Sequence, residues 1–586
     1  MYFEHGTIVF SPSDLTRFME SPFASWMERL YKEFPDRVTP DEGNEELQLY
    51  ADAGISHEAA FVKELEAQGN DLCWIKGDDR NATAEATLQA ITDKREIIFQ
   101  AYLTRPPFAG YADFLVRTSA DPVVYEIWDT KLAKTAKPYY LVQLCCYAEM
   151  LEAIQGQRPE FVEVVLGNGK RARFRTDDFW FYYQQLKAAF LQQMDSFDPE
   201  ADHPIPDPRA DHGHWQSHAD EWLLDRDHLF QVANIAVSQI QKLNQAGIET
   251  VAQLAASKIS RIPRLNDNTY RRLVSQASIQ LKTHAAQAKA DDGSEVRPAF
   301  EVLPGDLKNP HIGLALLPPA SRQDIYFDIE GFPLFEGGLE YLLGAVTVEK
   351  KKPLFHDWWA HDKAGEKLAF EQFIDWVMLR WKQDPSMHIY HYAAYEVSAM
   401  RRLMGQHGTR EDEVDALLHA KVFVDLYQII RQGILLGASN YSLKTVEKLY
   451  QDQREGDVKS AGASMVYYAN WMQSGEPRNW EKSPILKDIR DYNEVDCVST
   501  WQAEAWLRQL QANENVAYLP KTSKPKDDAT QNPSISKRRE ALQRRRQLAA
   551  QLVQQIPDKP STRAEQAERW QIQELLSHLL QFHHRE

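Results

Sequence analysis

The sequence predicts a multidomain α/β protein. Its 586 residues exceed the usual size of a single hydrophobic core, so we expect three or four domains. Apolar residues make up 43% of the chain and charged residues 26%, a balance typical of soluble globular proteins. Segments with strand periodicity, such as 125–131 and 324–330, are interspersed with segments of helical periodicity, such as 489–496.

The most informative strand covers residues 125–131. Tyr125, Ile127, Asp129 and Lys131 alternate with the residues between them, so Asp129 and Lys131 project from the same face. A carboxylate in this position can hold a divalent metal ion, and the ammonium group beside it can stabilise an attacking water or a charged transition state. Asp113, at the end of an earlier apolar run, is the candidate for a second metal ligand.

This order of residues resembles the RecB-like branch of the PD-(D/E)xK nucleases over about residues 8–185. Residues 11–15 and 21–23 resemble the entry segment of that branch, and residues 54–58 resemble its upstream histidine motif. Gln143 and Tyr147 lie four positions apart on a predicted helix and match its Gln-x-x-x-Tyr signature.

The resemblance implies a restriction-endonuclease-type α/β core with one or two Mg²⁺ or Mn²⁺ ions. It implies metal ligation by His57, Asp113 and Asp129, with the two aspartates counted as catalytic together with Lys131. Gln143 and Tyr147 would support the site or contact nucleic acid. Many RecB-like nucleases also hold an iron–sulfur cluster. We expect none here, because the four cysteines (Cys73, Cys145, Cys146 and Cys497) do not flank the domain.

A second set of acidic residues lies in the C-terminal half. Residues 324–331 are predicted as a strand on which Asp328 and Glu330 share a face. Glu396 precedes a predicted helix over 397–404, and Tyr492 and Asp496 are four positions apart on another. Acids from two strands and two helices can together hold two metal ions for phosphodiester hydrolysis.

Residues 320–510 resemble the DEDD exonucleases, and among them the YprB-like ribonuclease-H-like domains. The resemblance implies two Mg²⁺ or Mn²⁺ ions held by Asp328, Glu330, Glu396 and Asp496, with Tyr492 orienting the nucleophilic water. Glu396 stands where the general pattern has aspartate. Asp425 is either a further acid of this site or a residue of the turn that ends its strand.

Between these regions the sequence predicts a small all-helical module, with helices around 240–254 and over 269–281. It resembles a helix-hairpin-helix fold, although a helical bundle without a nucleic-acid role is an equal alternative. The predicted boundaries are a nuclease domain over 1–200, the helical module over 201–287, a linker over 288–319, a second nuclease domain over 320–517, and over 518–586 a basic, partly disordered tail with a C-terminal helix.

The net charge of −18 opposes general nucleic-acid binding, although bound cations would neutralise the acidic clusters. Local groups of basic residues are either phosphate contacts or solvated faces; they include Lys131, Lys134, Lys137, Arg261, Arg264, Arg271, Arg272, Arg401 and Arg402. We expect a cytoplasmic protein with no signal peptide and no membrane span. Because no P-loop motif occurs, any DNA unwinding would need a separate helicase or other partner.

These observations predict a metal-dependent deoxyribonuclease (a phosphodiesterase) with two active sites. It would cut or trim single-stranded DNA or DNA ends in repair, recombination or defence. One alternative is a 3′–5′ exonuclease that processes RNA. Another is a nucleic-acid-binding scaffold in which one or both sites are inactive.

Overall fold

The computed structural model describes residues 1–4, 6–43, 45–290, 296–304, 310–451, 461–519, 544–545, 547–554, 556 and 567–580. The chain divides into two units, 1–518 and 519–586, and each is described here by itself. In the second unit, helix α20 spans Ala567–Leu579. Most of the predicted basic tail, including residues 520–543, lies outside the described residues. No described helix combines the length and apolar character that a membrane span requires.

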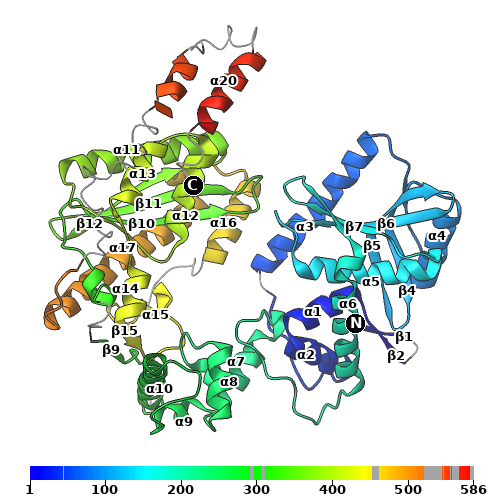
Figure 1. Cartoon of the computed structure of the whole chain (residues 1–586), viewed down its shortest axis with the longest axis horizontal. Coiled ribbons are helices and arrows are strands. Elements are labelled where there is room, and N and C mark those ends of the chain that lie inside the picture. Colours follow the sequence, from blue (N-terminus) through cyan, green and yellow to red (C-terminus); the bar gives the residue numbers. More distant parts are fainter. Residues whose placement is uncertain are drawn as a thin grey trace. The chain divides into compact units, whose positions relative to one another are not determined.

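A six-stranded sheet forms the centre of the N-terminal domain (Figure 1). In spatial order its strands are β3 (Leu72–Trp74), β4 (Ile97–Arg105), β5 (Phe108–Ala120), β6 (Val123–Lys131), β7 (Phe161–Leu166) and β8 (Arg171–Arg175). Strands β4, β5 and β6 form an antiparallel meander, and β7 pairs parallel to β6. The strand predicted over 125–131 corresponds to β6, whose end places Asp129 and Lys131 at one edge of the meander.

Helices cover both faces of this sheet, because apolar side chains project from its strands on both faces. Leu115 and Ile127 join the core beneath α1 (Pro12–Glu20), α5 (Pro138–Gln155) and α6 (Thr176–Asp195). Phe114 and Trp128 pack with α3 (Glu45–Ala67) on the other side. The remaining elements are α2 (Pro22–Glu33), α4 (Arg80–Thr92) and the hairpin of β1 (Tyr2–Glu4) and β2 (Thr7–Val9).

A helical module follows. It contains α7 (Gln216–Asp225), α8 (Val237–Gln245), α9 (Val251–Ala255) and α10 (Asp267–Gln287) around one apolar core. Gly247 has a φ of 77° just after α8, which is the left-handed backbone that a tight turn needs and that glycine adopts without strain. The stretch before α7 contains the fully buried Trp215, which packs against Phe23 and Trp26 of α2.

The C-terminal domain is built on a five-stranded sheet. Its strands, in spatial order, are β12 (Lys352–Trp359), β11 (Leu339–Glu349), β10 (Ile325–Phe332), β13 (Ile389–His391) and β14 (Phe423–Asp425). The first three are antiparallel, whereas β10, β13 and β14 are parallel, so their carboxyl ends lie at the same edge. In β10, Ile325, Phe327 and Ile329 face one apolar core, and the residues between them face the other side.

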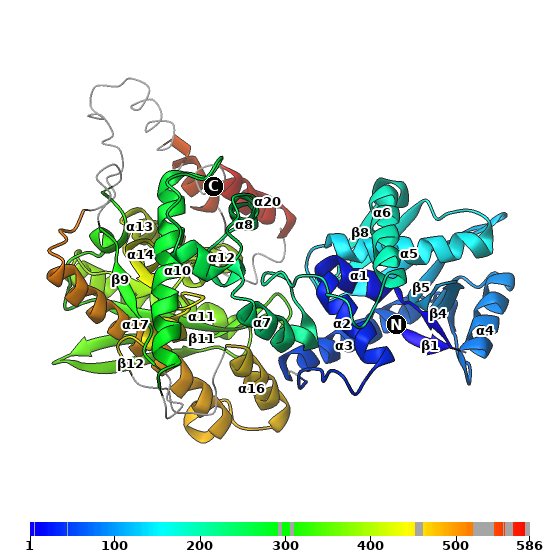
Figure 2. The same ribbon diagram turned by 90° about the horizontal axis from the view of Figure 1, so that it is seen from below.

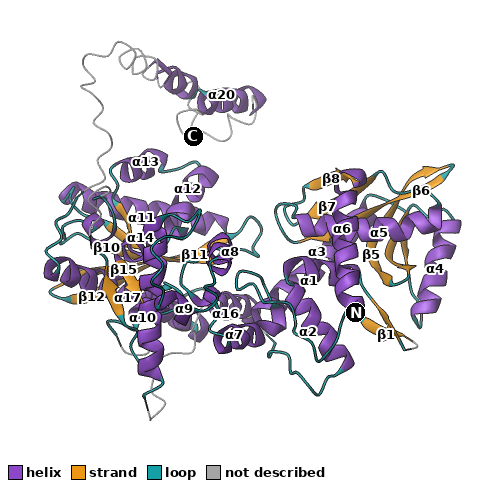
Figure 3. Cartoon of the chain, turned by 60° about the horizontal axis from the view of Figure 1, so that its bottom comes forward, coloured by secondary structure: helices purple, strands orange, loops and turns teal. Residues whose placement is uncertain are grey.

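Helices also cover both faces of this sheet (Figure 3). One face packs against α11 (Lys363–Gln383), α12 (Tyr395–His407) and α13 (Glu411–His419). The other packs against α14 (Leu426–Gly433) and the long α17 (Pro484–Asn513), and α10 lies beside this part of the domain (Figure 2). The remaining elements are β9 (Phe300–Val302), which pairs with β15 (Ile434–Leu436), α15 (Leu443–Glu447) and α16 (Ala461–Ser474).

Candidate active sites

Strand β10 directs Asp328 and Glu330 toward α17. Tyr326, two residues earlier on the same face, donates a hydrogen bond to Glu504 of α17 at 3.2 Å. Period-two geometry therefore brings Asp328 and Glu330 to the same helix, as the sequence predicts. Both carboxylates are largely withdrawn from solvent, and the residue Glu330 is only 5% exposed.

Helix α17 supplies the third carboxylate of this cluster. Tyr492 and Asp496 lie one helical turn apart on α17 and face the strand. One carboxylate oxygen each from Asp328, Glu330 and Asp496 lies within 4.8 Å of the other two. Two strand positions and one helix position, separated by more than 160 residues of sequence, thus form one compact acidic site.

Asn493 is a member of this site that sequence reasoning missed. Its side-chain Nδ2 donates a hydrogen bond to Asp328 Oδ2 at 2.7 Å, and its side chain also bonds to Glu330. The residue is completely buried, and a Cβ atom on Gly344 of β11 would lie 1.6 Å from Asn493 Oδ1. Glycine at position 344 is therefore the residue that leaves space for the amide. Asn493 follows the predicted Tyr492 directly, but nothing in the local pattern marks it.

The acidic cluster is electrostatically unfavourable without a cation. Burial raises the pKa of Asp328 well above its usual range, and the charges of Asp496, Glu330 and Glu396 raise it further. Burial and the charge of Asp496 raise the pKa of Glu330 to about 8, although hydrogen bonds from Ser464 and Asn493 oppose this shift. Buried carboxylates that repel one another and converge within one ion's reach fit a divalent metal site.

Glu396, the fourth predicted acid, lies near this cluster but outside the group of three oxygens. It occupies the first turn of α12 and is 3% exposed. Its Oε2 is 3.3 Å from Nδ1 of the buried His391 and finds no hydrogen-bond partner among the described residues. A buried carboxylate oxygen without a hydrogen-bond donor is a further feature that suits a cation ligand.

Asp425 takes the second of its two predicted roles. Its Oδ1 accepts hydrogen bonds from the backbone N–H of Ala393 at 3.0 Å and of Gln428 at 3.3 Å. It therefore caps the N-terminus of α14 and holds the loop that leads into α12. Because two backbone donors occupy this oxygen, Asp425 is a structural residue of the strand end.

Tyr492 lies beside the acidic cluster with its hydroxyl hydrogen-bonded to Asp496. Burial raises its pKa, and the negative charges of Asp496, Glu330 and Asp328 raise it further, so the phenol stays protonated. The Lys444 ammonium lies 5.7 Å from the centre of the Tyr492 ring. While it donates to Asp496, the neutral phenol can still accept a hydrogen bond from a water.

In the N-terminal domain, Lys131 and Asp129 lie together at the end of β6. Lys131 Nζ is 2.6 Å from Asp129 Oδ2, and the Tyr140 ring of α5 lies 5.6 Å from the ammonium. Burial raises the pKa of Asp129 to about 7; the Lys131 charge opposes this shift and the Asp113 charge adds to it. Asp113 is held by Thr130, whose backbone N–H donates to its Oδ2 at 3.0 Å.

The third predicted ligand, His57, lies on α3, and its Nε2 is buried without a hydrogen-bond partner among the described residues. His57, Asp113 and Asp129 do not form a group of three ligand atoms within 4.8 Å in the described part of the chain. The acid that approaches Asp113 is Glu58. Its pKa is raised by burial and by the Asp113 charge, and Gln100 donates to its Oε1 at 3.0 Å. Glu58 lies beside His57 in sequence, so the segment that resembles the histidine motif also carries an acid near Asp113.

Gln143 and Tyr147 support this region from α5. The two side chains are hydrogen-bonded to each other, and the Tyr147 hydroxyl donates to the carbonyl of Tyr111 at 2.6 Å. Burial raises the pKa of Tyr147, as do the charges of Asp129 and Asp113. The tyrosine therefore lies close to both aspartates and connects the helix to the strand before Asp113. Cys145 and Cys146 of the same helix are buried in its apolar core.

Residues 325–508 match the family model of the RNase_H superfamily. This match covers the five-stranded sheet and the acidic cluster. The region is an RNase H-like domain, and this supports a nuclease that acts on nucleic acid and binds divalent metal. The comparison with curated proteins gives no match.

Proposed function

We propose that this protein is a metal-dependent deoxyribonuclease whose principal active site is the acidic cluster of the RNase H-like domain. The observation that carries the proposal is the convergence of Asp328, Glu330 and Asp496 within 4.8 Å. In this proposal Glu396 completes the ligand set for Mg²⁺ or Mn²⁺, and the domain belongs to the YprB-like DEDD exonucleases. Bound divalent ions would supply an activated water and neutralise charge on the phosphate.

The protein's own residues prepare this site in two ways. Asn493 holds Asp328 through a 2.7 Å hydrogen bond, which restricts the carboxylate to one orientation. Tyr492 remains protonated and hydrogen-bonded to Asp496, and its oxygen is placed to accept a hydrogen bond from a water and so orient it. Burial of the acids excludes bulk water, which strengthens every electrostatic interaction with a bound phosphate.

The N-terminal domain is proposed as a second, RecB-like site that uses Asp113, Asp129 and Lys131. The close approach of Lys131 and Asp129 supports this role, because an ammonium group there can stabilise negative charge on a phosphate. Glu58 is proposed as an additional acid beside His57. The choice of DNA as substrate rests on the resemblance of residues 8–185 to DNA nucleases.

One observation favours a protein with a single active site. In the described part of the chain, the only three-ligand group within 4.8 Å is in the RNase H-like domain. In that case the N-terminal domain would bind a nucleic-acid strand without cutting it. The substrate of the RNase H-like site could then be RNA, because the argument for DNA comes from the N-terminal domain.

The deciding experiment uses end-labelled single-stranded DNA, duplex DNA and RNA with Mn²⁺, Mg²⁺ or EDTA. Wild type is compared with Asp129→Asn, Asp328→Asn and the double variant. Two active sites predict that each single variant removes a different set of products and that the double variant removes all cleavage. A single site predicts that Asp129→Asn leaves the products unchanged. Binding without any cleavage would refute the nuclease proposal and leave a scaffold.

A further inference from the structure

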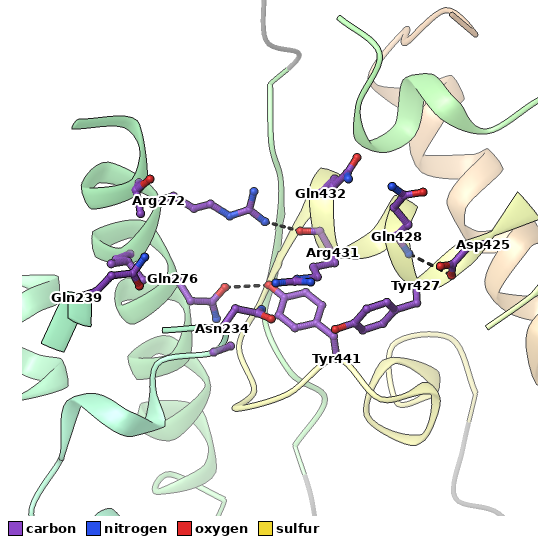
Figure 4. Close-up of a pocket in the computed structure, with 13 residues that line it drawn as sticks. Asn234, Gln239, Arg272, Gln276, Asp425, Tyr427, Gln428, Arg431, Gln432 and Tyr441 are labelled. Atoms are coloured by element: carbon purple, nitrogen blue, oxygen red, sulfur yellow. Dashed lines mark hydrogen bonds between the residues drawn. The ribbon is translucent and has the colours of Figure 1, made fainter. Parts of the chain in front are cut away.

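A pocket of about 590 Å³ lies where the helical module meets the RNase H-like domain (Figure 4). Its wall on one side comes from α10, α8 and the segment before α8, and on the other side from the end of β14, α14 and the loop that follows β15. The side chains that Figure 4 labels there are Asn234, Gln239, Arg272, Gln276, Asp425, Tyr427, Gln428, Arg431, Gln432 and Tyr441. The volume falls in the range of natural small-ligand pockets.

Two arginines make this pocket cationic. Arg272 of α10 donates a hydrogen bond to the backbone carbonyl of Arg431 in α14, so the two residues meet across the pocket. Neither guanidinium forms an ion pair within the part of the chain that the structure describes. Burial raises the pKa of Tyr441, and both arginine charges oppose this shift, which places both guanidinium groups near its hydroxyl.

The only carboxylate that lines the pocket does not neutralise these arginines. Asp425 is engaged by the backbone N–H groups of Ala393 and Gln428. Two guanidinium groups that face one cavity without a paired carboxylate repel each other, and an anion between them would relieve this repulsion. A phosphate group is an anion that such planar donors bind with two parallel hydrogen bonds.

The pocket also offers a flat aromatic surface. The half-buried ring of Tyr427 lies 6.0 Å from the Arg431 guanidinium carbon and 5.8 Å from the Tyr392 ring. Side-chain amides of Asn234 and Gln428 reach the same cavity, and both residues are exposed to solvent. An aromatic ring, amide groups and two arginines together match a nucleotide, which carries a base, polar ring edges and a phosphate.

Hydrogen bonds connect this pocket to the loop that leads into α12, whose first turn carries Glu396. Asp425, at the carboxyl end of β14, accepts a hydrogen bond from the backbone N–H of Ala393, which lies three residues before Glu396. The Tyr392 hydroxyl donates to the backbone carbonyl of Tyr441 at 2.5 Å. Because β10, β13 and β14 are parallel, the pocket lies at the same edge of the sheet as the active-site acids.

We propose that this pocket binds one nucleotide unit, a phosphate with its base, of the single strand that the RNase H-like site processes. The inference rests on the proposed nuclease function and extends it with a second contact for the substrate. Arg272 and Arg431 bind the phosphate, and Tyr427 stacks on the base. The helical module thereby takes part in holding the strand, through side chains that line a cavity.

The test measures binding of a fluorescently labelled single-stranded oligonucleotide in EDTA, where cleavage does not interfere. Arg272→Ala and Arg431→Ala are each expected to weaken binding about tenfold, because each removes a charge-assisted hydrogen bond to phosphate. The slope of log affinity against log salt should fall by about 0.7 for each phosphate contact that is lost. Tyr427→Leu should weaken binding to a similar degree with little change in this slope.

The matched control is Arg271→Ala, which removes the same charge from an exposed neighbouring position of α10 outside the pocket. Its affinity should equal that of the wild type, and thermal unfolding should show that all variants are folded. Unchanged strand affinity in Arg272→Ala and Arg431→Ala would overturn the proposal, even if a free 5′-mononucleotide or inorganic phosphate bound the pocket. Displacement of the strand by a mononucleotide in wild type but not in these variants would support it.

A separate cleavage assay distinguishes this proposal from the proposed function. One outcome is that the wild type cuts no substrate with Mn²⁺ while Arg272→Ala binds the strand more weakly than the wild type. This would refute the nuclease function and retain the binding pocket. Metal-dependent cleavage together with unchanged affinity in both arginine variants would refute the pocket alone.

Discussion

Replacing Glu330 by glutamine should stabilise the metal-free protein, because it removes a buried carboxyl that is costly to ionise. The pKa of Glu330 rises from 4.5 to about 8 in the folded chain, through burial and the charge of Asp496. Between these two pH values the folded state binds the proton more tightly than the unfolded state, so ionisation favours unfolding as the pH rises. Glutamine has nearly the same shape and no such dependence.

The size of this effect follows from the shift in pKa. One pH unit between the two values corresponds to about 1.4 kcal/mol, so Glu330→Gln should be more stable by about 4 kcal/mol at pH 7.5 and only about 1 kcal/mol at pH 5.5. Urea unfolding in EDTA at the two pH values measures both differences. The matched control is Glu336→Gln at an exposed position, which should leave stability unchanged at either pH.

Metal addition should narrow the difference in stability between the variant and the wild type at pH 7.5. Mn²⁺ at one hundred times its dissociation constant should stabilise the wild type by about 2.7 kcal/mol, whereas Glu330→Gln lacks a ligand and should gain much less. Two results would refute the reasoning. One is a variant that is less stable than the wild type in EDTA at pH 7.5, and the other is an equal response of both proteins to Mn²⁺.

Three further predictions concern residues around the two sites. Asn493→Ala removes the donor that orients Asp328 and should weaken Mn²⁺ binding about 10- to 100-fold, as measured by a metal titration of thermal unfolding; unchanged affinity would contradict this positioning role. Gly344→Ala should displace Asn493, because the new Cβ would lie 1.6 Å from its Oδ1, and should lower both the unfolding temperature and Mn²⁺ affinity. Glu58→Gln in an Asp328→Asn background should reduce the remaining cleavage at least tenfold if Glu58 serves the N-terminal site, and retention of full activity would assign that site to other residues.

Much of the local structure could be predicted because it depends on short-range periodicity. Alternation along a strand places Asp328 and Glu330 on one face of that strand. The turn of a helix places Tyr492 and Asp496 on one face of that helix. The same reasoning identified β6 with Asp129 and Lys131, and the helices of the middle module. These relations involve residues within about four positions of each other, so steric and hydrogen-bonding rules of the backbone determine them.

Relations across the chain depended on packing that periodicity does not encode. Asn493 enters the site because glycine at position 344 leaves space on a strand about 150 residues away. Glu58 of α3 approaches Asp113 of β5, because the packing of α3 against the sheet brings these two elements together. A sequence motif identifies a turn of helix, but the contacts of its side chains depend on how that helix packs.

The pocket of the helical module illustrates the same division. Arg272 and Arg431 are 159 positions apart, and in sequence each is an ordinary basic residue on an amphipathic helix. The sequence by itself determined which faces of each strand and helix are apolar, acidic or basic. Only the tertiary structure decided which of these faces meet, because distances between elements follow from the close packing of whole cores rather than from any local pattern.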